Sequence, residues 1–173
     1  MIIISQYEKR FNSKTQIFSI ISKENVPCPF CGGELRYRDC VVRDVIQSSG
    51  TVETLQIRRM ECPDCGHLHR ELPDFIQPFK HYASEVIESV LDGDCSSCPA
   101  ENSTISRWKA WFLRILPYLC AALTAVQAYV SDSSVKLMRD LSPVTDMRPN
   151  GSGWLRGVMR RRVNFAGNLS GIT

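Results

Sequence analysis

Apolar and polar residues between positions 34 and 71 follow the two-residue period of a half-buried β-strand. Residues 52–60 alternate, with Val52, Leu55 and Ile57 apolar, and residues 34–46 are rich in β-forming side chains. The intervening QSSGT is typical of a turn. The pattern predicts a hairpin here and one further short strand in HLHREL after Gly66. A single short strand or helix is expected within residues 1–26, before the first cysteines.

Two later segments show the helical period of three to four residues. The first runs from Ala83 to Leu91 and is expected to end at Asp92-Gly93. The second begins at an Asn102-Ser103 cap, and Pro117 is expected to kink or end it. Residues up to 130, 134–141 and 154–163 are also predicted to be helical. The apolar face of the second helix is formed by Ile105, Trp108, Phe112, Ile115 and Leu116.

Composition places the chain among soluble globular proteins: 43% of its 173 residues are hydrophobic and 23% are charged. The apolar run Ile2–Ile4 is too short for a signal peptide, which predicts a cytoplasmic protein with reduced or metallated thiols. The uncharged stretch 115–130 is 16 residues long, shorter than the roughly 20 that a membrane span requires. It is therefore interpreted as a buried helix, with no membrane partner.

Four of the eight cysteines form two Cys-Pro-X-Cys-Gly motifs. The two-residue gap lets both sulfurs of a pair reach one tetrahedral ion, and the glycine that follows turns the backbone around it. Four thiolates leave no open coordination position, so the site is structural and not catalytic. The sequence predicts one structural Zn²⁺ held by Cys28, Cys31, Cys62 and Cys65.

Two alternatives surround this site. His67 and His69 are interpreted as strand residues at its edge, although either could replace a cysteine as a ligand. Cys95 and Cys98 form a third CxxC without the glycine; free thiols are the favoured interpretation, and a second zinc site is the alternative. A second site would need ligands recruited from Cys40, Cys120, His67, His69 or His81.

Two short helices after a zinc ribbon favour a helix-turn-helix. The polar side of the second helix suits the major groove, where Arg107 could reach a guanine edge or a phosphate. A solvated face of a surface helix is the alternative. The net charge of +3 permits a nucleic-acid partner, and Arg58 and Arg59 could neutralise further phosphates. The candidate DNA-binding residues are Ser103, Ser106, Arg107, Lys109, Ala110, Arg114, Arg160, Arg161 and Arg162.

The run CPFCGG…RRMECPDCGHLHRELPDFIQPFKHYA…STISRWKAWF resembles the zinc-ribbon plus helix-turn-helix heads of bacterial insertion-sequence transposases, and more closely an uncharacterised bacterial domain family related to them. The resemblance covers residues 25–116. It implies the same four cysteine ligands and a recognition helix from Ser103 to Arg114. The segment DCSSCPAEN departs from it, because it is short for a full middle helix.

A nuclease core of the transposase type needs well-spaced carboxylates, and only Asp132, Asp140 and Asp146 follow the helices. The expected function is therefore a non-enzymatic, zinc-containing DNA-binding protein: a transposase-derived regulator or an accessory recognition subunit of a mobile element. Double-stranded DNA is the expected partner, with a protein partner or separate catalytic subunit also possible. The alternative is a zinc-ribbon adaptor that docks on a nuclease, polymerase or other effector.

The expected fold class is α+β, an N-terminal zinc ribbon with a small antiparallel sheet followed by a helix-turn-helix-like region. Its four segments are an extension (1–25), the ribbon (26–74), the helix-turn-helix-like region (75–116) and a C-terminal helical region with a basic tail (117–173).

Overall fold

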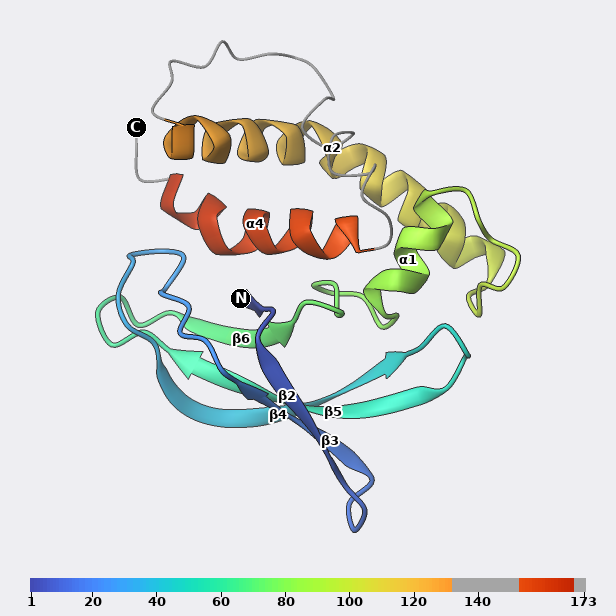
Figure 1. The fold of residues 1–173 in the computed structure, drawn as a ribbon, viewed down its shortest axis with the longest axis horizontal. Helices are drawn as coiled ribbons and strands as arrows, with labels where there is room; N and C mark the ends of the chain where they lie inside the picture. The colour runs from blue at the N-terminus through green and yellow to red at the C-terminus, as the bar shows by residue number, and fades with distance from the viewer. Residues whose placement is uncertain (132–152, 170–173) are drawn as a thin grey trace.

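The computed structural model describes residues 1–131 and 153–169, which form a curled mixed sheet with helices against one side of it (Figure 1). The predicted helix over 134–141 lies outside these residues, as do Asp132, Asp140 and Asp146. The elements, in chain order, are β1 (Ile2–Ile4), β2 (Tyr7–Asn12), β3 (Ile17–Ser22), β4 (Arg36–Ile46), β5 (Val52–Glu61), β6 (Leu68–Pro73), α1 (Ser84–Leu91), α2 (Asn102–Ser131) and α4 (Trp154–Leu169).

Strand β5 organises the sheet. It pairs antiparallel with β4 along its whole length, which confirms the predicted hairpin between the two CxxC pairs. Its other edge is shared: β3 pairs with it in parallel at Thr54–Gln56, and β6 pairs with it antiparallel at Arg59–Glu61. The sheet is extended by β2 beyond β3 and by β1, which lies parallel to β6. The six-stranded sheet thus takes half of its strands from the first 22 residues.

The helices bury the faces that the sequence pattern predicts. In α1, Val86, Ile87 and Val90 are buried, and in α2 Trp108 and Phe112 are at most 6% exposed. These side chains join Leu55, Ile57 and Leu72 of the sheet and Leu155 of α4 in one hydrophobic cluster. The helix α2 continues through Pro117 instead of ending there. None of the helices in the described part of the chain is long and apolar enough to cross a bilayer.

Helix α4 lies between α2 and the sheet (Figure 1). The buried polar side chains of Glu88 and Asn164 hold it there. The carboxylate of Glu88 in α1 accepts hydrogen bonds from the backbone N–H groups of Gly153 and, at 2.8 Å, Leu155. It therefore caps the N-terminus of α4, where unpaired donors and the helix dipole favour an anion. Asn164 accepts a hydrogen bond from the Ile3 N–H at 2.8 Å and donates one to the Ile3 carbonyl at 2.7 Å. Its amide thus pairs with the free edge of β1 as a neighbouring strand would.

The predicted fold class is wrong. The strands that follow the CxxC pairs are not a small separate ribbon, because β1, β2 and β3 join them in the same sheet. The region after them is not a helix-turn-helix either: ten residues separate α1 from α2, and α2 is a 30-residue helix packed in a layer with α4. Residues 1–25, expected to be an extension, contribute Ile2, Ile3 and Ile4, which are each at most 1% exposed.

Candidate metal centre

The two CxxC motifs fold into turns with the same hydrogen bonds. In the first, Gly32 N–H donates to the Cys28 carbonyl and Cys28 N–H donates to the Gly33 carbonyl, both at 2.8 Å. In the second, Gly66 N–H donates to the Cys62 carbonyl at 2.8 Å and Cys62 N–H donates to the carbonyl five residues later at 3.0 Å. Gly32 and Gly66 have φ of 78° and 71°, the left-handed region that glycine adopts most easily, as predicted.

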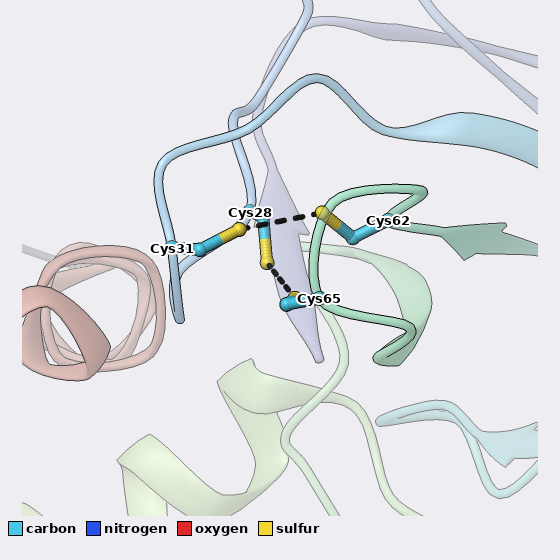
Figure 2. A group of neighbouring side chains, drawn as sticks. All are labelled: Cys28, Cys31, Cys62 and Cys65. Atoms are coloured by element: carbon cyan, nitrogen blue, oxygen red, sulfur yellow. Dashed lines mark hydrogen bonds between the residues drawn. The ribbon is translucent and has the colours of Figure 1, made fainter.

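The matching turns bring the four cysteine sulfurs together, although they come from different parts of the chain (Figure 2). All four lie within 4.8 Å of one another, with Cys31 and Cys62 3.4 Å apart and Cys28 and Cys65 3.7 Å apart. Four sulfurs at about 2.3 Å from a tetrahedral ion are separated by roughly 3.8 Å. The arrangement therefore fits a metal ion, and no other group of three or more such ligands occurs within residues 1–131 and 153–169.

Electrostatics of the thiols point in the same direction. Burial opposes ionisation of Cys62, but hydrogen bonds from the backbone of Cys65 and from the Cys31 thiol outweigh it and lower the pKa of Cys62 to about 7. Although Cys65 accepts a backbone hydrogen bond, burial and the neighbouring thiols raise its pKa to about 12. Ionisation of Cys62 is therefore favoured, whereas ionisation of Cys65 in the same cluster is opposed. A divalent cation at the centre would relieve that opposition, since metal ligands bind in the deprotonated form.

His67 and His69, which the sequence placed at the edge of the site, lie beside the sulfurs, and His69 belongs to β6 as expected. His69 is 5% exposed, and its Nε2 lies 3.3 Å from Cys28 Sγ, so it contacts a ligand without belonging to the four-sulfur group. His67 stacks on Phe30, with ring centroids 4.1 Å apart. A Cβ on Gly33 would lie 2.1 Å from Asp64 Oδ2, which shows how closely the two turns approach. The motif CxxCG specifies only the glycine directly after the second cysteine, so it does not predict that Gly33 must also be glycine.

The third CxxC does not form a comparable site. Cys95 and Cys98 are half-buried free thiols, and neither joins a group of three or more metal-ligating side chains among the described residues. Cys40 and Cys120 are free thiols as well. The second zinc site therefore has no support in the described part of the chain.

The candidate DNA-binding residues fall into two groups. Those on α2 are all exposed, five of them on the side opposite Trp108 and Phe112 and Lys109 on its flank, and Arg107 donates side-chain hydrogen bonds to its own helix, at Ser103. Those on α4 lie apart from them: Arg160 is paired with Glu24 at 2.6 Å, while Arg161 is exposed and Arg162 is half-buried. The exposed residues on α2 are Ser103, Ser106, Arg107, Lys109, Ala110 and Arg114.

The sheet arginines that were expected to neutralise phosphates are already paired. Arg58 forms a two-pronged ion pair with the buried Glu71, at 2.6 and 2.8 Å, and Arg59 pairs with Asp39. The hydrogen bond to Glu71 raises the pKa of Arg58 by more than burial lowers it, so the net shift is upward. Both guanidinium groups are therefore committed within the sheet.

Comparison with known proteins adds one finding. Residues 28–108 match a domain of unknown function (DUF6431). The match runs from the first cysteine of the metal centre to Trp108 in α2 and assigns no activity. No curated protein and no solved structure matches the chain. The resemblance to transposase heads therefore stays a prediction.

Proposed function

We propose that this protein is a non-enzymatic, zinc-containing protein that binds double-stranded DNA through the exposed face of α2. Zinc is the metal that best suits the centre, because soft thiolates in a tetrahedral set favour it and it needs no open position there. A closed shell offers no site for a substrate, which supports a structural role. Eight free thiols suit a reducing compartment and hence a cytoplasmic location.

The observation that carries the proposal is the charge of α2. The helix contains Arg107, Lys109 and Arg114 but no acidic residue, and none of the three forms an ion pair with a described residue. Lys80 extends this positive surface: its ammonium lies 4.5 Å above the Trp111 ring, and burial together with the charge of Arg114 lowers its pKa. Unpaired cations on one exposed helix suit a phosphate backbone.

Binding to a DNA duplex, measured by fluorescence anisotropy at several salt concentrations, tests the proposal. The triple variant Arg107→Gln, Lys109→Gln, Arg114→Gln removes the positive face. A matched control, Lys14→Gln, Arg36→Gln, Arg38→Gln, removes the same charge from exposed residues of the β2–β3 turn and β4. Each lost phosphate contact lowers the slope of log K against log[salt] by about 0.9. The α2 variant is expected to lose roughly 2.7 of that slope and the control little; equal losses, or no binding by the native protein, would refute the proposal.

The adaptor alternative has one observation in its favour. Leu113 and Tyr118 of α2 are 68% and 70% exposed, and large exposed apolar side chains mark many protein interfaces. The two functions separate experimentally. Leu113→Ser, Tyr118→Ser should leave DNA binding intact if the three cations carry it, whereas a native protein that binds no DNA would favour the adaptor.

A further inference from the structure

A cavity of about 470 Å³ is lined in part by Phe79 and His81 of the loop between β6 and α1 and includes none of the four cysteines of the metal centre. It is lined by residues of β4, β5, β6 and the loop, with Ile57 and Leu72 as buried apolar members. Its volume falls in the range of small-ligand sites, about 300–1,000 Å³. Neither the metal centre nor the face of α2 accounts for it.

Two arginines in this cavity lack carboxylate partners. Arg43 donates hydrogen bonds to the backbone carbonyls of Gln77, at 3.0 Å, and Lys80, which use part of the five donors of its guanidinium. The guanidinium of Arg70, on β6, makes no hydrogen bond or ion pair with the described residues. Elsewhere in the sheet arginines are paired with carboxylates, as Arg58 is with Glu71. Burial lowers the pKa of Arg43, and the charge of Arg70 lowers it further.

The remaining polar lining leaves the cavity positive. Asp44 is its one carboxylate, and Asp44 accepts a hydrogen bond from Thr54 Oγ1 at 2.7 Å rather than pairing with either arginine. His81 adds a further nitrogen donor or acceptor at the wall. Arg43, held in place by backbone carbonyls, and the neighbouring Arg70 suit an anion with several oxygens, because a planar guanidinium binds phosphate particularly well.

An aromatic ring stands at the rim of the same cavity. Phe79 lines it and is 82% exposed, the largest exposure among the big apolar side chains of the described residues. Its φ is 61°, a left-handed conformation that bulky residues rarely adopt. The adjacent Lys80 is held over Trp111, so the loop is anchored while the Phe79 ring faces solvent. Exposed rings beside arginines are the usual platforms on which nucleic-acid bases stack.

We propose that this cavity binds a nucleotide, with the phosphate between Arg43 and Arg70 and the base stacked on Phe79. The shared chemistry is a phosphate ester joined to a planar base, supplied either by a free mononucleotide or by an unpaired nucleotide of a single strand. None of the residues that line this cavity belongs to α2, so the proposal is independent of the proposed duplex binding.

Calorimetric titration of the zinc-loaded protein with AMP, adenosine, inorganic phosphate and a (dT)₁₀ oligonucleotide tests the site. Binding of AMP alone identifies a free nucleotide, and binding of (dT)₁₀ identifies a single strand; either supports the proposal. Arg70→Gln is expected to weaken binding of the bound nucleotide probe about tenfold or more, and Phe79→Ala to weaken it by a similar factor while leaving inorganic phosphate unchanged. The matched controls are Arg38→Gln and Phe11→Ala, exposed residues outside the cavity.

Three results would overturn the proposal: no binding of AMP or (dT)₁₀ at millimolar concentration, equal binding of adenosine and AMP, or unchanged affinity in both cavity variants. Circular dichroism and thermal melting check that the variants are folded, and both replaced side chains are exposed. The triple variant of α2 is titrated with AMP in the same way. It is expected to keep AMP binding even where it loses duplex binding, so failure of one proposal is distinguishable from failure of the other.

Discussion

The side chain of Asn164 offers the sharpest test of how the C-terminal helix is attached to the sheet. Its two hydrogen bonds, at 2.8 and 2.7 Å, satisfy both backbone groups of Ile3, which is 1% exposed. Replacing Asn164 with leucine keeps most of the volume and removes both partners. We therefore expect the Ile3 N–H and carbonyl to stay buried and unpaired.

The magnitude follows from the cost of such groups. A buried backbone donor or acceptor without a partner costs about 1–3 kcal/mol, so the two together lower the free energy of unfolding by about 2–6 kcal/mol. A typical domain has only about 5–15 kcal/mol in total. The loss in Asn164→Leu is therefore expected to be a large share of the stability, and it should come with faster hydrogen exchange at the Ile3 amide.

Urea denaturation followed by tryptophan fluorescence measures this change, with the zinc concentration held constant. The matched control is Arg161→Leu, an exposed position on the same helix, where the change is expected to stay within about 0.5 kcal/mol. If Asn164→Leu unfolds within about 0.5 kcal/mol of the native protein, or if exchange at Ile3 is unchanged, the pairing of Asn164 with β1 contributes nothing and the reasoning is wrong.

Two further predictions concern buried and half-buried carboxylates. Glu88→Ala removes the cap from the N-terminus of α4 and is expected to cost about 2 kcal/mol in thermal or urea unfolding, whereas the exposed Glu85→Ala should cost much less. Glu24 is buried enough to oppose its charge, yet backbone hydrogen bonds and Arg160 outweigh burial and lower its pKa below the model-peptide value of 4.5. Its stabilisation is therefore present above pH 4.5 and lost as pH falls through the lower folded pKa. Glu24→Gln should be less stable than the native protein at pH 7, by about 1 kcal/mol, and this difference should shrink as unfolding is measured at pH values progressively below 4.5.

Local patterns in the sequence predicted the elements around the metal centre. The alternation of Val52, Leu55 and Ile57 marked the hairpin, and the spacing of Trp108 and Phe112 marked the buried face of α2, because both signals arise within a few residues. The paired CxxCG motifs predicted the four clustered sulfurs for the same reason: each turn is fixed by its own glycine and hydrogen bonds.

What the sequence did not predict depends on partners far away in the chain. Ile2–Ile4 is too short to be recognised as a strand, and it becomes one by pairing with β6, nearly seventy residues later. The parallel pairing of β3 with β5 is equally remote. These contacts turned an expected ribbon into part of a larger sheet. Whether an arginine is paired, as Arg58 is, or unpaired, as Arg70 is, likewise depends on the folded arrangement and not on its neighbours in sequence.

The most direct test of the account is the metal content of the purified protein together with the effect of removing the metal. We expect one zinc ion per chain. Structural zinc sites contribute roughly 10–16 kcal/mol, comparable to or larger than the whole stability of a typical domain, so chelation under reducing conditions should unfold the sheet and added zinc should restore it. Cys62→Ser, Cys65→Ser should lose the zinc, whereas the matched control Cys95→Ser, Cys98→Ser should retain it. A protein that carries no metal, or one whose circular dichroism and melting temperature are unchanged by chelation, would contradict the claim that these four cysteines hold a structural zinc.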